Sequence, residues 1–278
     1  MNEKRIHRAV SVDGTDIAGR VVGQGPALVL VHGGIGHGDL AWEALLPHLT
    51  NRYTCYLPST RGRGLSGDHA DHNPARLVED VTAFVDSIGE PVSLLGWSGS
   101  GPWCLGAAAR SSSVVAVAAF EPVVPGSGEA DMARFGAALE KVGIAAADGR
   151  LVDAVRAFAS GICTDDEVAA LEKTTFFERW AGAVPALLND LGQDMAYHGP
   201  RSIDPKSLEQ VTVPVLVIRG EQTLLNSLWG ESAQHIVRHV SDTRVRELPG
   251  VGHFAPLLAP ELLAEELISF MESVHQPA

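Results

Sequence analysis

Ser98 is the residue of this chain whose surroundings are most indicative of chemistry. An apolar run over 92–95 precedes it, glycines stand on both sides of it, and the helix-forming segment 104–109 follows. A serine at such a junction of strand, turn and helix sits on a sharp bend that pushes its hydroxyl into solvent. The amide of Gly99 would then lie at a helix N-terminus, where developing negative charge is stabilised. The segment therefore predicts nucleophilic attack by the Ser98 hydroxyl on a carbonyl carbon.

The turn departs in one place from the usual pattern around such a serine. That pattern is G-x-S-x-G, but here Ser100 holds the last position and the glycine follows one place later, at Gly101. Because serine is small enough for many closely packed positions, we interpret the change as conservative. The alternative is an ordinary turn rich in glycine and serine, and the rest of the chain has to decide between the two.

A loop close to the C-terminus offers a base for Ser98. A serine hydroxyl is a poor nucleophile until a neighbouring base takes its proton. His253 follows a strand expected over 243–248, and the glycines at 250 and 252 leave its loop free to point toward the serine. The alternative is a loop histidine without a chemical role. Of the other histidines, we expect His32 to be structural and His72 to be solvated.

Composition and charge limit the kinds of partner. The 278 residues are 45% hydrophobic and 20% charged, which is typical of one large globular domain or of one domain with an insertion. The net charge of -13 argues against nucleic acid and anionic membranes as partners. The widely spaced Cys55, Cys104 and Cys163 indicate neither a metal site nor a disulfide framework. Because no signal segment or membrane-spanning run is found, we expect a cytoplasmic protein.

The elements that must position these residues alternate between strands and helices along much of the chain. Two strands joined by the turn Asp13-Gly14 come first, over 6–12 and 15–22. Further strands are expected over 27–31, 53–57, 92–97, 114–120, 213–220 and 243–248. Helices are expected over 40–50, 76–89, the segment after Ser98, 227–239 and 260–273. This alternation predicts a mostly parallel, doubly wound sheet.

The alternation stops in one long stretch of the chain. Only helix-like segments are found there, over 130–143, 151–161, 165–173 and 176–191. We therefore expect a helical block of roughly eighty residues, 126–205, inserted into an α/β core that is formed by 1–125 and 206–278.

Several ordered motifs make nearly the whole chain resemble an α/β-hydrolase fold enzyme with a helical cap. Each follows a strand, and they are His32-Gly33-Gly34, Arg61-Gly62-x-Gly64-x-Ser66, Gly96-x-Ser98 and Gly250-x-Gly252-His253. The resemblance implies an eight-stranded, mostly parallel sheet with helices on both faces, and catalysis at the carboxyl ends of its strands. It also implies that His253 is the base and that the amides of Gly34 and Gly99 form an oxyanion hole.

The acid that would orient His253 is less clear. In most of the family it is an aspartate at the end of a G-x-x-D turn, but here that turn ends in Thr223. Glu221 lies in the same turn, two places early. Glu121 follows the apolar strand 114–120, where a minority of the family carries its acid, including some haloalkane dehalogenases and zearalenone-type lactonases. Because an unpaired buried carboxylate is costly, we favour Glu121 over Glu221.

These residues predict a serine hydrolase that cleaves small-molecule carboxylic esters or lactones through an acyl-enzyme, without metal or cofactor. The place of Glu121 favours a lactonase-like branch. The candidates for lining the substrate pocket are Trp97, His37, Phe176, Trp180 and His198, of which the aromatic ones could equally be packing residues.

Three alternatives stay open. A carbon–carbon bond hydrolase and a perhydrolase would use the same serine. A ligand-binding receptor with a hydrolase-like pocket is favoured only by the missing aspartate at Thr223. A homo-oligomer is compatible with the sequence.

Overall fold

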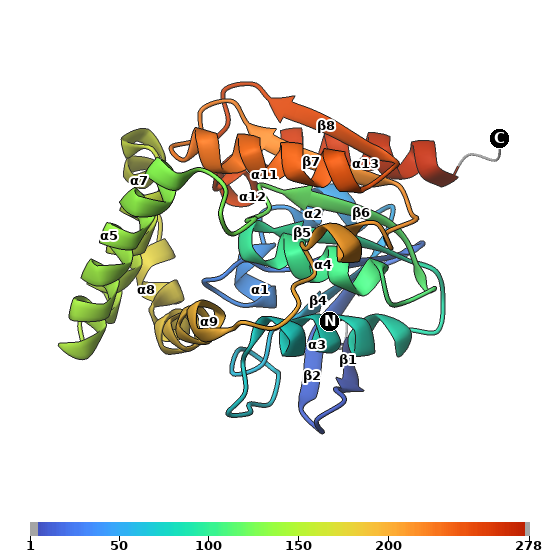
Figure 1. The fold of residues 1–278 in the computed structure, drawn as a ribbon, viewed down its shortest axis with the longest axis horizontal. Helices are drawn as coiled ribbons and strands as arrows, with labels where there is room; N and C mark the ends of the chain where they lie inside the picture. The colour runs from blue at the N-terminus through green and yellow to red at the C-terminus, as the bar shows by residue number, and fades with distance from the viewer. Residues whose placement is uncertain (1–4, 276–278) are drawn as a thin grey trace.

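One sheet runs through the part of the chain that the computed structural model describes, residues 5–275 (Figure 1). Residues 1–4 and 276–278 of the expected core lie outside the described range. The strands are β1 (Arg5–Val10), β2 (Asp16–Gly23), β3 (Ala27–Val31), β4 (Thr54–Pro58), β5 (Val92–Trp97), β6 (Val114–Phe120), β7 (Val215–Gly220) and β8 (Thr243–Leu248). Apart from shifts of one or two residues at the ends, these are the strands that the sequence predicts.

The sheet has the order β1-β2-β4-β3-β5-β6-β7-β8. β1 and β2 pair antiparallel, as do β2 and β4, and every other neighbouring pair is parallel. The expected eight-stranded, mostly parallel sheet is therefore confirmed. The order places the carboxyl ends of β3, β5, β6, β7 and β8 along one edge of the sheet, where open sheets of this type bind their ligands.

Side chains of the central strands point alternately to the two faces of the sheet and form two buried cores. In β3, Leu28 and Leu30 belong to one core, whereas Val29 and Val31 belong to the other. The first core is covered by α1 (Gly38–Ala41), α2 (Leu46–Leu49) and α13 (Pro260–His275), and the second by α3 (Pro74–Asp86), α4 (Gly101–Ala108) and α11 (Asn226–His239). Because both faces are covered, the strands read as continuous apolar runs.

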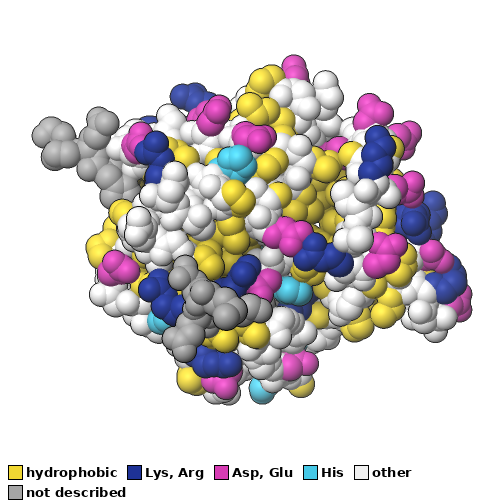
Figure 2. All heavy atoms as spheres, turned by 180° about the vertical axis from the view of Figure 1, so that it is seen from behind, with side chains coloured by type: hydrophobic (Ala, Val, Ile, Leu, Met, Phe, Trp, Pro, Cys, Tyr) yellow, Lys and Arg dark blue, Asp and Glu magenta, His cyan; other side chains and the backbone are white. Residues whose placement is uncertain are grey.

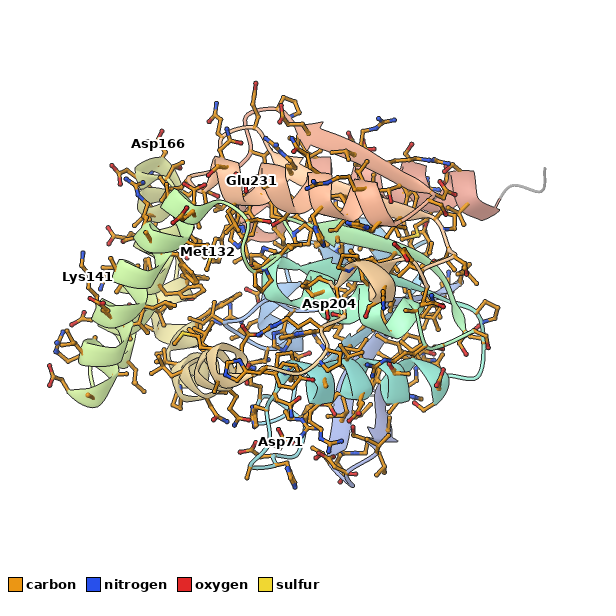
Figure 3. The ribbon with its side chains drawn as sticks, in the orientation of Figure 1. Asp71, Met132, Lys141, Asp166, Asp204 and Glu231 are labelled. Carbon is orange, nitrogen blue, oxygen red and sulfur yellow. The ribbon has the colours of Figure 1, made fainter. Side chains whose placement is uncertain are left out.

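A group of helices between β6 and β7 lies beside the sheet, at the left of Figure 1. They are α5 (Glu129–Ala147), α6 (Leu151–Ile162), α7 (Asp165–Leu171), α8 (Phe176–Trp180) and α9 (Val184–Ala196). We call residues 126–205 the cap. In Figure 3, Lys141 lies on the outer side of α5 and Met132 on the side toward the rest of the molecule. The short helix α10 (Pro205–Leu208), which begins at the last residue of the cap, packs against α4 and α11.

Two expected helices are each divided in the structure. The helix expected over 40–50 is two short helices, α1 and α2, and Pro47 lies in the first turn of α2. The helix expected over 176–191 breaks at a 3₁₀ turn over Ala181–Ala183, and Pro185 lies in the first turn of α9. Proline has no amide N–H and collides with the carbonyl one turn earlier, so it starts a new helix rather than continuing the old one.

The surface carries charges of both signs, and the three cysteines lie in the interior. Basic and acidic side chains are interspersed over the face shown in Figure 2. All three cysteines, Cys55, Cys104 and Cys163, are buried free thiols. Among the described helices, none combines the length and the apolar character that a membrane span would need.

Candidate active site

The bend at Ser98 has the geometry that its sequence predicts. β5 ends at Trp97, a 3₁₀ turn covers Ser98–Ser100, and α4 starts at Gly101. Ser98 has φ = 58°, and within the described residues only Glu121 shares a positive φ among the non-glycine residues. Such a conformation costs on the order of 1–3 kcal/mol and persists only where the surrounding structure enforces it. The two strained residues lie at the ends of neighbouring strands.

The unusual order of Ser100 and Gly101 has a packing reason. The buried Ser100 hydroxyl accepts the Trp97 amide N–H at 2.8 Å and lies 2.7 Å from the carbonyl oxygen of Val31. It thereby ties the end of β5 to the end of β3. At Gly101, an added Cβ would lie 2.6 Å from the Cβ of Pro122, closer than carbon atoms approach without bonding. The glycine is therefore needed one place later, where α4 passes the residue that follows Glu121.

Glu121 and His253 are directly joined. Glu121 Oε2 lies 2.6 Å from His253 Nδ1, and Glu121 Oε1 accepts the Gly220 amide N–H at 2.9 Å. Both side chains are buried, the carboxylate completely. In the sheet, Trp97 pairs with Phe120, so Ser98 and Glu121 leave adjacent strands at the same level. The register of β5 and β6 thus brings the serine bend and the carboxylate to one place.

The turn after β7 supports this carboxylate instead of supplying one. The hydroxyl of Thr223, at the position where an aspartate is expected, donates to Glu121 Oε2 at 3.3 Å. Glu221 is exposed, and its Oε2 accepts the Gly250 amide N–H at 2.8 Å, so it stabilises the histidine loop away from the imidazole. Of the two candidate acids, the structure therefore brings Glu121 to His253.

Aromatic side chains enclose the imidazole. The ring of Trp229 stacks on His253 with 4.8 Å between centroids and 7° between planes. Trp97 donates its indole N–H to the His253 carbonyl oxygen at 3.1 Å. The expected pocket residue Trp97 is thus buried beneath the histidine loop, where it fixes the backbone of that loop.

The loop after β3 passes beside the serine. A Cβ built on Gly33 would lie 3.5 Å from Ser98 Cβ. The carbonyl oxygen of Gly34 accepts a hydrogen bond from Arg63 Nη2 at 2.8 Å. Around Gly99, the space where a Cβ would stand is open. Gly33 therefore lies beside Ser98 and Gly34 follows it in the same loop, where Arg63 fixes the peptide after the Gly34 amide.

The remaining pocket candidates fall into two groups. Phe176 and Trp180 are buried in an aromatic cluster with Phe254, at ring-centroid distances of 5.2 and 6.2 Å from it, so they lie where the cap meets the histidine loop. His37 is partly exposed at the start of α1, and partial burial lowers the pKa of its imidazole. His198 is exposed in the loop after α9. The structure brings the aromatic residues to the site region but places His198 on the surface.

His72, expected to be solvated, is instead buried. Its Nδ1 lies 2.7 Å from Asp190 of α9 and its Nε2 lies 2.8 Å from Asp68. The hydrogen bond to Asp190 is the largest cause of the raised pKa of His72. Asp190 also pairs with Arg63 at 2.6 Å. Because Asp190 is 118 residues from His72 and lies in the cap, sequence spacing carries no signal for this network.

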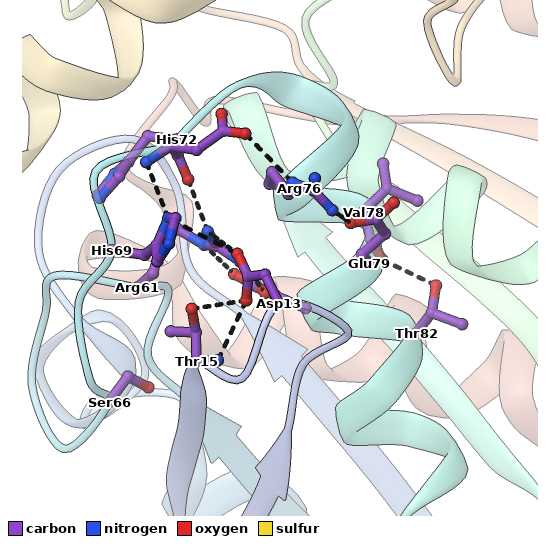
Figure 4. A network of polar contacts seen from close by, with 12 residues as sticks. Asp13, Thr15, Arg61, Ser66, His69, His72, Arg76, Val78, Glu79 and Thr82 are labelled. Carbon is purple, nitrogen blue, oxygen red and sulfur yellow. Dashed lines mark hydrogen bonds and ion pairs between the residues drawn. The ribbon is translucent and has the colours of Figure 1, made fainter.

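His32 and Arg61 are structural. His32 is fully buried, accepts the Thr60 amide N–H at 3.0 Å, and has its pKa lowered to about 3 by desolvation. Arg61 is fully buried, binds Asp80 through two nitrogens, and also binds Asp13 at 2.8 Å (Figure 4). Within residues 5–275, no group of three or more His, Cys, Asp or Glu side chains is arranged to hold a metal ion.

Comparisons with known proteins agree with this fold. The sequence profile described as the Alpha/beta hydrolase family matches residues 28–266. A 2-(acetamidomethylene)succinate hydrolase from Mesorhizobium japonicum is 23% identical over 281 residues, which cover 96% of each chain. A pimeloyl-[acyl-carrier protein] methyl ester esterase from Xanthomonas campestris is 38% identical over 98 residues, 35% of this chain and 37% of the other. The structure of the esterase RhEst1 from Rhodococcus sp. has a TM-score of 0.78 at 23% identity, with 97% of this chain and 99% of that chain covered.

Proposed function

The chain belongs to the alpha/beta hydrolase family, and on this premise we propose that it is a serine hydrolase that cleaves carboxylic esters or lactones. The observation that carries the proposal is the bond of 2.6 Å between Glu121 and His253, next to the strained bend at Ser98. A nucleophile, a base and an orienting carboxylate are the parts that acyl transfer needs.

The hydrogen bond to Glu121 decides which nitrogen of His253 acts. Since Nδ1 faces the carboxylate, the neutral imidazole carries its proton there and leaves Nε2 as the acceptor. Nε2 takes the proton of Ser98 Oγ as this oxygen bonds to the substrate carbonyl carbon. The imidazolium that results is stabilised by Glu121 and returns the proton to the leaving alkoxide oxygen. Water activated by His253 then hydrolyses the acyl-enzyme.

The carbonyl oxygen of the substrate becomes negatively charged during attack. In our proposal the donors for this oxyanion are the amide of Gly99, directly after Ser98, and the amide of Gly34, in the loop after β3. The bond from Arg63 to the Gly34 carbonyl oxygen holds that part of the loop in place before substrate arrives. Preorganised donors of this kind lose no energy to reorientation during the reaction.

Two further observations support the choice of an ester hydrolase over a receptor. The receptor alternative rested on the missing aspartate at Thr223, but the Thr223 hydroxyl donates to Glu121, which supplies the carboxylate from β6. The Xanthomonas relative is named as a methyl ester esterase and the Rhodococcus structure as an esterase. The position of Glu121 after β6 is the reason to include lactones among the substrates.

A turnover screen with p-nitrophenyl esters of increasing acyl length, and with small and macrocyclic lactones, tests the proposal. Ser98→Ala is the blank, because it removes only the Oγ atom of a partly exposed side chain, which is the proposed nucleophile. We expect saturable turnover of at least one ester or lactone by the wild type and none above background by the variant. Equal rates for the two proteins, or no turnover of any ester or lactone, would contradict the proposal.

A further inference from the structure

A third carboxylate reaches the histidine loop besides Glu121 and Glu221, and it comes from the cap. Glu167 lies in the first turn of α7, and its side chain is buried. Glu167 Oε1 accepts the amide N–H of Phe254, the residue after His253, at 2.9 Å. This is a contact between two segments 87 residues apart in the sequence. The position of the base is therefore tied to a helix of the cap.

The other oxygen of Glu167 is fixed as well. Its Oε2 accepts the Thr164 amide N–H at 3.2 Å, and the Thr164 hydroxyl accepts the Glu167 amide N–H at 3.3 Å, which forms a capping box at the start of α7. A Cβ built on Gly252 would overlap the carboxylate of Glu167. The glycine before His253 therefore does more than free the loop: it makes room for this carboxylate.

The electrostatic surroundings of Glu167 connect it to the base. Burial raises the pKa of the Glu167 carboxyl, the charge of His253 opposes this rise, and the charge of Glu121 adds to it. Burial, followed by the charges of Glu167 and Glu121, raises the pKa of the buried Cys163 thiol. The titratable groups that interact electrostatically with Glu167 are thus His253, Glu121 and Cys163. Among these, His253 is the group that can become positive.

A buried carboxylate without a cation is unfavourable unless hydrogen bonds and a nearby positive charge offset its desolvation. Two backbone amides supply the hydrogen bonds to Glu167. The positive charge is present only while the imidazole of His253 is protonated, which in the proposed mechanism is the state that forms during attack by Ser98. An interaction that is stronger in that state than in the resting enzyme speeds the reaction.

We propose that Glu167 is a positioning residue for His253: it fixes the histidine loop through the Phe254 amide and adds a second negative charge that favours the imidazolium. The inference rests on the proposed function. Its consequence is that the base has its full strength only when α7 of the cap is seated on the core, so the cap takes part in catalysis as well as in covering the site.

Two variants separate this role from simple helix capping. Glu167→Gln keeps an oxygen acceptor for the Phe254 amide and removes the charge, whereas Glu167→Ala removes both. Glu172→Gln is the matched control, because it removes the same charge from an exposed position at the other end of α7. The readouts are kcat, KM, and the pH dependence of kcat/KM for the ester found in the screen.

For Glu167→Gln we expect kcat to fall about tenfold with KM little changed, which corresponds to about 1.4 kcal/mol. Without the negative charge the imidazolium forms less readily, so the acidic limb of the profile should move to lower pH by roughly half a unit or more. Glu167→Ala should be slower still, and Glu172→Gln should match the wild type. An unshifted limb in Glu167→Gln would overturn the inference, even if both Glu167 variants melt at lower temperature.

A second readout does not depend on ester turnover. The Nδ1 proton of His253, held by Glu121, should give a downfield proton NMR signal whose change with pH reports protonation of the ring. In Glu167→Gln this change should move to lower pH, and it should stay in place in Glu172→Gln. If the wild type hydrolysed no ester but the NMR shift occurred, the proposed function would fail while the role of Glu167 stood. An unmoved NMR titration would overturn that role.

Discussion

The ends of β6 and β7 lie side by side in the sheet, yet the glutamates that follow them have different surroundings. Glu121 after β6 is fully buried, has a strained backbone, and bonds to His253. Glu221 after β7 is exposed and bonds to a backbone amide of the histidine loop. Thr223, two residues after Glu221, donates a hydrogen bond to Glu121. In our proposal the orienting acid therefore follows β6, and the turn after β7, where the family resemblance would place it, supplies a hydrogen-bond donor for it instead.

The largest expected effect comes from removing the charge at the end of β6. Glu121→Gln should lower kcat by about 10³- to 10⁴-fold, because a glutamine amide favours the wrong imidazole tautomer and cannot stabilise the imidazolium. Glu221→Gln removes the same charge from the neighbouring strand end and should stay within about twofold of the wild type. Steady-state kinetics with one ester compare the two. Equal losses of kcat in both variants would contradict the different roles of Glu121 and Glu221.

A carboxylate placed in the turn after β7 tests whether that position can take over the role of Glu121. In Glu121→Gln, an added Thr223→Asp change places a carboxylate next to the group that now bonds to Nδ1 of His253. We expect the double variant to recover about tenfold or more of the lost kcat, since part of the orientation and charge is restored. In the wild-type background, Thr223→Asp should instead lower activity, because two carboxylates would share one site. A double variant no more active than Glu121→Gln, or a Thr223→Asp single variant as active as the wild type, would contradict this account.

The approach of α4 to the end of β6 should appear in stability. Gly101→Ala places a methyl group against Pro122, so we expect the free energy of unfolding to fall by about 1–3 kcal/mol. Gly99→Ala is the matched control, because the same methyl group enters open space there and should change stability by less than about 0.5 kcal/mol. Urea unfolding followed by tryptophan fluorescence measures both. A stable Gly101→Ala would mean that the shifted glycine has no packing role.

The smallest effect on kcat is expected from removal of the Thr223 hydroxyl, in the turn after β7. Thr223→Val keeps the shape of the side chain and removes the hydroxyl that donates to Glu121. The loss of one hydrogen bond to a buried carboxylate is worth about 1 kcal/mol, so kcat should fall about fivefold. Thr212→Val, at an exposed position before β7, should have no effect. A Thr223→Val enzyme as active as the wild type would show that the Gly220 amide and His253 hold Glu121 without the Thr223 hydroxyl.

The sequence predicts the sheet and the residues along its edge for a clear physical reason. Buried parallel strands read as apolar runs, so β3, β5, β6 and β7 are recognisable, and a glutamate directly after such a run needs a buried partner. This argument leads to Glu121 without any knowledge of the distance to His253. The breaks before α2 and α9 were also within reach, because Pro47 and Pro185 mark them.

The parts that sequence reasoning missed depend on contacts between distant segments. The Ser100 hydroxyl meets the end of β3, Asp190 of the cap meets Arg63 and His72, and Glu167 meets the histidine loop. Each of these polar side chains looks like a solvated or capping residue in its own segment. Docking of the cap on the core brings Asp190 and Glu167 to their partners, and the pairing of β3 with β5 brings Ser100 to Val31.

The most direct test of the central claim is the rate at which a fluorophosphonate labels Ser98, followed by intact mass and mapped to the peptide. We predict stoichiometric labelling of the wild type at Ser98, labelling at the same rate in Glu221→Gln, and labelling at least a hundredfold slower in Glu121→Gln. Labelling of Glu121→Gln at the wild-type rate, or an unlabelled Ser98 in the folded wild type, would contradict the account.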